Sequence, residues 1–324
     1  MPVHLTRVCG RLAAGLLILG LSACGGGGGS AGSPPPPSVA VSAANQDAVT
    51  RAAFAGVAAG TLGSLPGIDS GTSSVAALSR SALKQALSAA GALRKRIAAD
   101  VSSELCPAGG SADASVNDTL PIGELNPGDA VSIRYSSCNV GDGVIVGGNL
   151  TVAYTTVTDT ELGADIGLAG LSVSDTVTGY SASSDGGFSL SLTATTTTLV
   201  SEMFVPDQLV MSSAHLGTAI DTVTLLDGYS VRSTAVSTSA TTTTTATGPV
   251  ASAAAGGFVS IDTPQALVQL DSEDYPRAGR VMVTGLRGTL RATVLSAAQV
   301  AIDLDANDDG SYEASKTVAW NTLL

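Results

Sequence analysis

RVMVTGLRGTLRATV, residues 280–294, alternates apolar and polar side chains on both sides of a Gly-Leu-Arg-Gly turn. Because successive side chains of a β-strand point to opposite faces of a sheet, this alternation predicts two half-buried strands joined as a hairpin. Similar short runs recur from residue 106 to the C-terminus, where Thr, Val, Ser and Gly dominate. Residues 106–324 are therefore predicted to form a mainly β domain.

The other alternating runs are VSIRY (131–135), LTVAYTTV (150–157), FSLSLTATTTT (188–198), VTLLDGYSVRS (223–233) and VAIDLD (300–305). Turns are expected at GDG 141–143, SDGG 184–187, LDGYS 226–230, PRAGR 276–280 and GLRGT 285–289, because Gly and Asp favour tight turns. No segment of helix length and period lies between these runs, which argues against parallel βαβ units. We expect an antiparallel β-meander, forming a curved sheet, a partial barrel or a sandwich.

The preceding segment, 39–105, is rich in alanine and is predicted to be helical. One helix is expected from Gln46 to Ala59, and a second is indicated by apolar residues spaced three to five apart. These residues are Val75, Leu78, Leu83, Leu87, Ala90, Leu93, Ile97 and Val101. The helices are expected to pack on one side of the sheet or across one of its ends.

The N-terminus has the zones of a secretory signal, assigned to residues 1–23. Arg7 and Arg11 form a basic start, and LAAGLLILG, residues 12–20, forms a short apolar core that ends in small residues. A helix that spans a bilayer needs about 20 apolar residues, so this run is too short to be one. The sequence therefore predicts export from the cytosol.

Leu-Ser-Ala-Cys at residues 21–24 resembles the lipobox of bacterial lipoproteins. The resemblance implies cleavage before Cys24, a diacylglycerol on its sulfur and an acylated new amino group, so that Cys24 anchors the protein to a membrane. Gly25 follows in place of aspartate, which by the same resemblance implies the outer membrane, with the face left open. The alternative is an ordinary signal peptide in which Cys24 is incidental. Residues 24–38, rich in Gly and Pro, are predicted to be a tether.

Composition limits the partners that this chain can have. The formal net charge is −12, and it becomes more negative when Arg7 and Arg11 leave with the signal. An acidic surface repels phosphates, and aromatic residues make up only 3% of the chain, which disfavours base stacking. We therefore expect no nucleic acid partner, and we expect the membrane, through lipid on Cys24, and envelope proteins as partners.

The four cysteines have separate predicted fates. Cys9 leaves with the signal and Cys24 carries lipid, which leaves Cys106 and Cys138 in the folded part. A pair of cysteines in an exported protein predicts a disulfide, and closing a loop of about 33 residues stabilises a fold by about 3.7 kcal/mol. A metal site at this pair would need histidine ligands, and His215 is the only histidine outside the signal.

Two stretches are similar to an uncharacterised group of proteobacterial lipoproteins. The first is CPAGGSADASVNDTLPIGELNPGDAVSIRYSSCNVGDGVIVGGNLT, residues 106–151, and the second runs from Tyr275-Pro276 through a strand pair and an acidic turn to Trp320. The resemblance covers about a third of the chain. It implies an exported lipoprotein with a disulfide-closed hairpin, and it implies no known activity.

One stretch, DLDANDDGSYE at residues 303–313, has the spacing of a calcium loop. Hard cations such as Ca²⁺ take several oxygen ligands from a tight turn. Asp305, Asn307 and Asp309 occupy positions 1, 3 and 5, Ser311 would offer its carbonyl at position 7, and Glu313 its side chain at position 9. Lys316 replaces the bidentate glutamate at position 12, and the flanking residues alternate as strands do. Either calcium pins this hairpin tip or the tip is a solvated acidic turn.

Catalytic candidates are few. His215, in SSAHLG, could serve a Ser-His-Asp arrangement, but a lone histidine among Ser and Ala is typical of a strand residue. Glu273 and Asp274 are neighbours in a Pro-bounded loop, and glycoside hydrolysis would need a partner carboxylate across a cleft. We therefore predict no catalytic residue and no certain cofactor. The favoured function is a non-enzymatic structural or interaction module of the envelope; the alternatives are a carrier of an apolar ligand and an envelope hydrolase.

Overall fold

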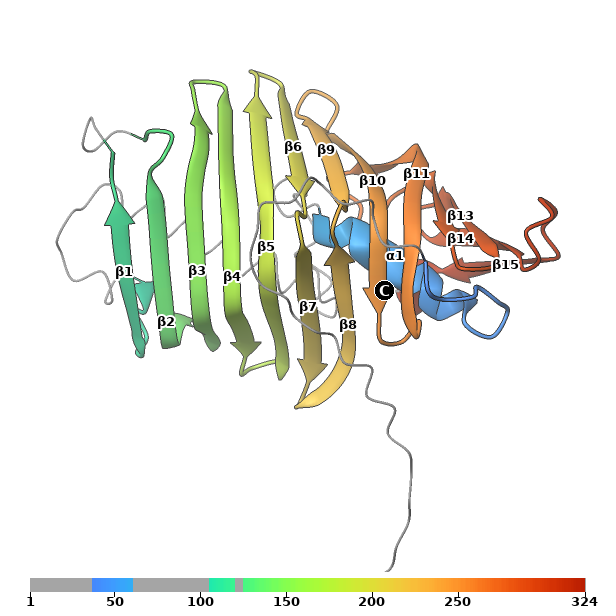
Figure 1. The fold of residues 1–324 in the computed structure, drawn as a ribbon, viewed down its shortest axis with the longest axis horizontal. Helices are drawn as coiled ribbons and strands as arrows, with labels where there is room; N and C mark the ends of the chain where they lie inside the picture. Colours follow the sequence, from blue (N-terminus) through green and yellow to red (C-terminus); the bar gives the residue numbers. More distant parts are fainter. Residues whose placement is uncertain (1–36, 61–104, 120–124, 324) are drawn as a thin grey trace, which may run out of the picture. The chain divides into compact units, whose positions relative to one another are not determined.

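The structure, a computed structural model, describes residues 37–60, 105–119 and 125–323, which belong to one compact unit. These residues contain two helices and a 15-stranded sheet (Figure 1). The helices are α1 Gln46–Gly60 and α4 Trp320–Leu323. The strands are β1 Ser111–Asn117, β2 Ala130–Gly141, β3 Val144–Val157, β4 Glu161–Asp175, β5 Tyr180–Ala194, β6 Thr198–Phe204, β7 Gln208–His215, β8 Thr218–Leu226, β9 Ser230–Val236, β10 Thr241–Ser252, β11 Gly257–Leu270, β12 Ala278–Thr284, β13 Thr289–Ser296, β14 Gln299–Asp305 and β15 Ala314–Ala319.

The sheet is an antiparallel meander, as the alternation in the sequence predicts. Strands β1 to β5 and β10 to β15 each pair with the next strand in the chain. Between them, β6 and β7 both pair with β5, while β9 and β8 both pair with β10, so that β6–β7 and β8–β9 behave as two interrupted long strands. Figure 1 shows β6 lying above β7 and β9 above β8. Among the described residues, β1 and β15 are the edges of this sheet.

Two of the predicted turns are hairpin turns. GDG 141–143 reverses the chain between β2 and β3, with Asp142 and Gly143 both at positive φ. GLRGT reverses it between β12 and β13, where the Gly285 N–H donates to the Gly288 carbonyl (3.0 Å). PRAGR, residues 276–280, includes the last two residues of the loop before β12 and the first three residues of that strand, which begins at Ala278.

Two other turn predictions are wrong. SDGG 184–187 lies inside β5, and LDGYS 226–230 separates β8 from β9, which continue in the same direction along β10. In both places glycine makes an irregularity within a strand and does not reverse the chain. The physical reason is close approach: a Cβ at Gly186, whose φ is +118°, would lie 2.1 Å from the carbonyl oxygen of Gln208 in β7.

Such irregularities lie next to one another across the sheet. A Cβ at Gly148 of β3 would lie 2.1 Å from the carbonyl oxygen of Gly170 in β4, and the pairing of each strand shifts there. The breaks 205–207 and 227–229 are joined by a hydrogen bond from the Val205 N–H to the Tyr229 carbonyl (2.9 Å). We call this row of contacts the bulge line; its members are Gly110, Ser137, Gly148, Gly170, Gly186, the breaks 205–207 and 227–229, and Gly248. Bulges bend a strand and increase its twist.

Helix α1 begins after Asn45, whose side chain accepts the Ser42 N–H (2.9 Å) and so fixes the approach to the first turn. The helix was predicted over Gln46 to Ala59 and is confirmed to within one residue. Its buried face carries Val49, Ala52, Ala53, Phe54 and Val57 and packs mainly on β10, with further contacts to β8, β9, β12 and β13. Helix and sheet thus share one apolar core.

The C-terminus closes this core at α4. Trp320 is fully buried, its indole ring meets Phe54 of α1 edge-on with 4.7 Å between ring centroids, and it stacks on Tyr275 at 5.4 Å. Its indole N–H donates to the Ser296 carbonyl (3.1 Å). The end of the chain is therefore held against both α1 and the β13–β14 turn.

Several predictions lie outside the described residues. These are the signal 1–23, the tether up to residue 36 and the second predicted helix with its apolar residues between Val75 and Val101. At the end of the predicted tether, Ser38 already contacts the sheet, because its backbone N–H donates to the Phe258 carbonyl (3.0 Å). Of the described helices, neither has the length and apolar character that crossing a membrane requires.

Candidate functional site

The acidic turn, residues 305–313, connects β14 to β15. Asp305 ends β14 and is buried, with an exposed fraction of 5%. Its Oδ2 accepts the Gly310 N–H (2.9 Å), whereas no described residue donates a hydrogen bond to its Oδ1. Carboxylate oxygens of Asp305, Asp309 and Glu313 all lie within 4.8 Å of one another. The fold therefore brings together three of the five residues that the sequence predicts as calcium ligands.

The other two predicted ligands lie on the same turn and shape it. Asn307 Oδ1 accepts the Asp309 N–H (2.9 Å), and its amide donates to Asp309 Oδ2 (3.1 Å). The Ser311 N–H donates to Asp309 Oδ1 (2.8 Å). The hydrogen bond from Ser311, followed by that from Asn307, lowers the pKa of the Asp309 carboxyl below its usual value. A ligand role for Asn307 and Ser311 stays a prediction.

Asp308, the remaining acidic residue of the turn, points to a different part of the molecule. Its carboxylate accepts the Gly288 N–H (2.8 Å) and the Thr289 hydroxyl (3.2 Å), and its φ is +61°. Asp308 thus ties the acidic turn to the neighbouring β12–β13 turn. This role could not be read from the sequence, because it depends on which turn lies beside this one.

The basic side chains of Arg291 and Lys316 are paired with carboxylates outside the acidic cluster. Arg291 on β13 donates to Asp303 Oδ2 from both Nε (3.0 Å) and Nη2 (2.9 Å), and it lies over the Tyr312 ring at 4.1 Å from the centroid. Lys316, which replaces the position-12 glutamate, forms an ion pair with Asp47 on α1. Their charges are therefore directed to Asp303 and Asp47.

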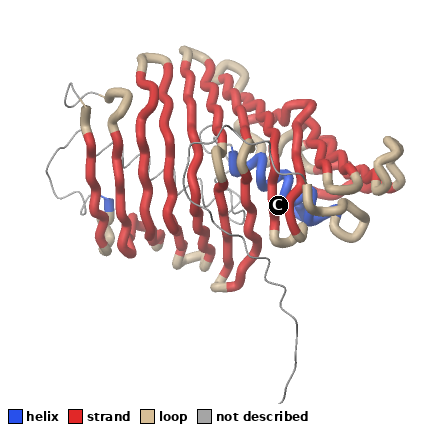
Figure 2. The backbone as a smooth tube through the Cα atoms, in the orientation of Figure 1, coloured by secondary structure: helices blue, strands red, loops and turns tan. Residues whose placement is uncertain are grey.

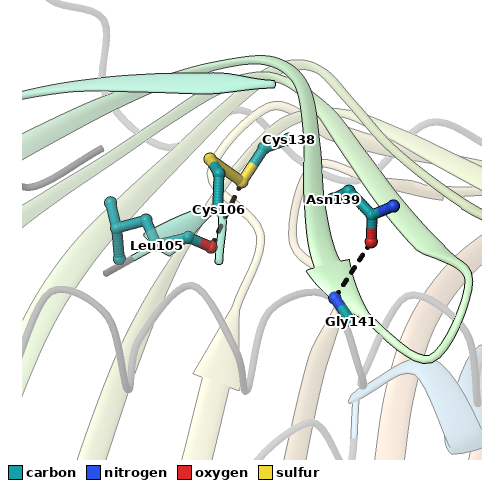
Figure 3. Close-up of a disulfide and its surroundings, with 5 residues drawn as sticks. All are labelled: Leu105, Cys106, Cys138, Asn139 and Gly141. Carbon is teal, nitrogen blue, oxygen red and sulfur yellow. Dashed lines mark hydrogen bonds between the residues drawn. A yellow bond between two sulfur atoms is a disulfide. The ribbon is translucent and has the colours of Figure 1, made fainter. Parts of the chain in front are cut away.

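The predicted disulfide is present in the structure. Cys106 and Cys138 are joined, with 5.0 Å between their Cα atoms, and Cys138 is fully buried (Figure 3). Backbone hydrogen bonds from Ala108 to Asn139 (3.1 Å) and from Asn139 to Gly109 (2.8 Å) extend the β1–β2 pairing up to the bond. The Asn139 side chain accepts the Gly141 N–H (3.0 Å) at the start of the hairpin turn, as Figure 3 also shows.

An open groove of about 660 Å³ crosses the polar face of the sheet, from β3 to β11. Strand pairing sets its lining residues in two neighbouring rows. Half of the side chains in these rows are Ser or Thr and bear hydroxyl groups. They surround an ion pair between Arg232 and Glu202 (2.8 Å) and the Phe204 ring, of which 42% is exposed. The first row is Ser191, Glu202, Arg232 and Thr245; the second is Asp165, Ser189, Phe204, Ser230, Thr247 and Asp262.

Sequence reasoning missed this groove. Alternation along each strand would place these residues on the polar face, since each alternates with a buried neighbour such as Met203 or Val231. It does not say which strands lie side by side, and the interrupted strands β6–β7 and β8–β9 were not foreseen. Which strands lie side by side becomes clear only in the folded sheet, whose backbone Figure 2 shows.

The remaining candidates are placed as follows. His215, at the end of β7, stacks on Tyr180 with 4.3 Å between ring centroids, which gives it a packing contact with β5. Glu273 pairs with Arg277 (3.4 Å) in the loop before β12. Cys24, the predicted lipidation site, lies outside the described residues.

Comparison with known proteins found no matching family model, no matching curated protein and no matching solved structure. The resemblance to proteobacterial lipoproteins therefore stays a prediction.

Proposed function

We propose that this chain is a lipid-anchored protein of the bacterial envelope that acts without catalysis, as a module that presents the polar face of its sheet to an envelope protein partner. The observation that carries the proposal is the groove across β3–β11. It combines hydroxyl side chains with an exposed aromatic ring and charged groups of both signs.

An open groove with a chemically mixed lining suits recognition of a protein surface. Exposed aromatic and arginine side chains are the residue types that most often dominate binding energy at protein interfaces. Phe204 on β6 and Arg232 on β9 lie diagonally across this strand pair, near the middle of the two rows. Hydroxyl groups around them can exchange hydrogen bonds with water for hydrogen bonds with a partner at little cost.

The groove favours this function over the carriage of an apolar ligand. A carrier site is concave and mostly apolar, so that it removes the ligand from water. Here the hollow is open, and Ser, Thr, Asp, Glu and Arg side chains share its lining with apolar ones such as Leu190, Met203 and Phe204. The open geometry and the charged groups therefore support a contact surface of mixed chemistry.

The N-terminal sequence supports the proposed lipid anchor, and the disulfide supports the proposed compartment. The Leu-Ser-Ala-Cys stretch and the Gly-rich tether support lipidation at Cys24. A disulfide between Cys106 and Cys138 supports an oxidising compartment, where such bonds persist. Both the predicted signal and the disulfide therefore support a location outside the cytosol.

Cell fractionation tests the anchor. Cys24→Ser removes the acceptor sulfur, and the protein is expected to move from the membrane to the soluble fraction of the envelope. Cys9→Ser is the matched control, because Cys9 lies in the segment removed on export, and it is expected to leave the protein in the membrane. Retention of the Cys24→Ser protein in the membrane, or release of both variants, would contradict the proposal.

Photo-crosslinking in intact cells tests the groove. A photoreactive residue at position 204 is expected to give a discrete adduct with an envelope protein. The same residue at position 134, an exposed position of β2 that does not line the groove, is the control and is expected to give none. Absence of an adduct at position 204, or equal adducts at both positions, would exclude the groove as the contact surface.

A further inference from the structure

We propose that the acidic turn binds a calcium ion, with the carboxylates of Asp305, Asp309 and Glu313 as its protein ligands. This site is separate from the groove and does not depend on the proposed function. The three side chains come from the end of β14 and from the turn that follows it, so a bound ion would join the two strands of the last hairpin.

The three carboxylates are close enough together to bind one and the same ion. Calcium binds oxygen at about 2.3–2.6 Å, so that two ligands of one ion are at most about 5 Å apart. Ligand oxygens of all three residues lie within 4.8 Å of one another, which satisfies this limit for every pair at once.

A second and independent observation is the state of Asp305. This side chain is 95% buried, with an exposed fraction of 5%, yet none of the described residues donates a hydrogen bond to its Oδ1. Burying a carboxylate oxygen without a partner is costly, because the oxygen loses water and gains nothing. A cation held between Asp305, Asp309 and Glu313 would supply the missing partner.

The surrounding charges leave this cluster negative. Arg291 is directed to Asp303 and Lys316 to Asp47, so these two basic side chains neutralise carboxylates outside the cluster. Three carboxylates held together repel one another, and a divalent ion reverses that repulsion. The fourth acid of the turn, Asp308, is bound to Gly288 and Thr289 and does not belong to the cluster.

The chemistry of the site predicts a modest affinity. Three carboxylates and solvent oxygens suit calcium, which accepts flexible shells of six to eight oxygens, but the bidentate glutamate of tight calcium loops is replaced by Lys316. Sites in extracellular modules bind calcium with dissociation constants of about 10⁻⁴–10⁻³ M, and this range is expected here.

Terbium luminescence and calorimetry on the purified full-length protein test the site. Tb³⁺ takes the same oxygen ligands as Ca²⁺, and Tyr312 within the turn is placed to sensitise its emission. We expect sensitised emission that added Ca²⁺ abolishes, together with calcium binding in the range stated above. Absence of both sensitised emission and binding heat at 10 mM calcium would overturn the proposal.

Matched variants locate the ion. Asp309→Asn and Glu313→Gln each remove one ligand charge with little change in shape, and each is expected to weaken calcium binding by about tenfold or more. Asp308→Asn removes the same charge from the same turn without removing a ligand, and it is expected to change the affinity by less than about threefold. Equal losses in Asp308→Asn and Asp309→Asn would show a diffuse charge effect and would overturn the assignment of the ligands.

A thermal melt gives an independent readout on folding. Trp320, the only tryptophan of the chain, begins α4 directly after β15, so its fluorescence reports on the hairpin that the ion would join. Calcium at 10 mM is expected to raise the melting temperature by about 2–5 °C, since a ligand that binds only the native state stabilises it. The Glu313→Gln protein, if folded as its circular dichroism shows, is expected to lose this shift; an equal shift in both proteins would contradict the site.

Discussion

At the β1 edge of the sheet, the covalent bond between Cys106 and Cys138 ties the segment before β1 to the far end of β2. At the β15 edge no cysteine is present, and the chain is held by the burial of Trp320 against Phe54, by the Lys316–Asp47 ion pair and by the hydrogen bonds of the acidic turn. Both edges belong to the same antiparallel meander, yet they are restrained in different ways.

The two kinds of restraint differ in whether they act on the unfolded state or on the native state. A disulfide stabilises mainly by reducing the freedom of the unfolded chain, and it does so wherever the bond survives. Aromatic packing and charged contacts exist only in the native state. The β1 edge should therefore respond to reductant, and the β15 edge to core substitutions, salt and divalent ions.

The largest effect is expected at the β15 edge. Trp320→Ala removes the ring that packs on Phe54 and Tyr275 and should cost about 3–5 kcal/mol of unfolding free energy. Urea denaturation followed by circular dichroism measures the loss. Leu295→Ala, at a side chain that is 53% exposed, is the control and should change stability by less than about 0.5 kcal/mol. A loss below 1 kcal/mol in Trp320→Ala would mean that α4 is not part of the core.

Removal of the disulfide should have the second largest effect. Replacing Cys106 and Cys138 together by serine should lower the unfolding free energy by about 2–4 kcal/mol, because the unfolded chain regains the freedom of the closed loop. The same denaturation experiment applies, with and without reductant. The double variant should be insensitive to reductant, whereas the parent protein should fall to the stability of the variant; a parent protein unaffected by complete reduction would contradict the role of the bond.

Alkaline pH should have the third largest effect, a loss of unfolding free energy that arises on the β1 side of the sheet. Burial raises the pKa of Tyr135, on β2, to about 12, and burial also raises the pKa of Tyr229. Because the native state holds these protons more tightly than the unfolded state, their stabilising contribution is complete below about pH 10 and is lost as the pH rises toward 12. Tyr135→Phe should flatten this decline in stability between pH 10 and 12. An unchanged slope would show that the Tyr135 phenol ionises without unfolding.

The smallest effect is expected for the ion pair at the β15 edge. Asp47→Asn should cost less than about 1 kcal/mol, since both Asp47 and Lys316 are partly exposed and water screens their attraction. A double-mutant cycle with Lys316→Met, repeated at 0.05 and 0.5 M salt, isolates the pair and should show a coupling that salt weakens. A salt-independent coupling would show that packing joins these residues and not charge.

Much of the fold could be predicted from local patterns. Alternation in VSIRY and in RVMVTGLRGTLRATV placed the strands β2, β12 and β13, and the alanine-rich run was sufficient for α1. SDGG was mistaken for a reversal because glycine serves both turns and bulges. Only the neighbouring strand decides between them: Gly186 is required by the carbonyl of Gln208, which is 22 residues away in the chain.

The candidate sites divide in the same way. The spacing of acids in the sequence identified Asp305, Asp309 and Glu313, because one turn supplies all three. The same spacing assigned Asp309 and not Asp308 to a ligand position, but it gave no role to Asp308, whose carboxylate accepts a hydrogen bond from Gly288 on another hairpin. The groove residues come from strands far apart in the chain, such as Asp165 and Asp262, and no local pattern joins them.

The bulge line has a consequence for a chain with so little variety in its strands. Runs of threonine and serine, as at Thr241–Thr245, could pair equally well after sliding by two residues, because the same faces would stay buried. A sliding step at β3 would move Gly148 away from Gly170 and force a side chain against that carbonyl. Each irregularity is therefore compatible with only one alignment of its two strands. In this way a repetitive sequence acquires a unique strand pairing.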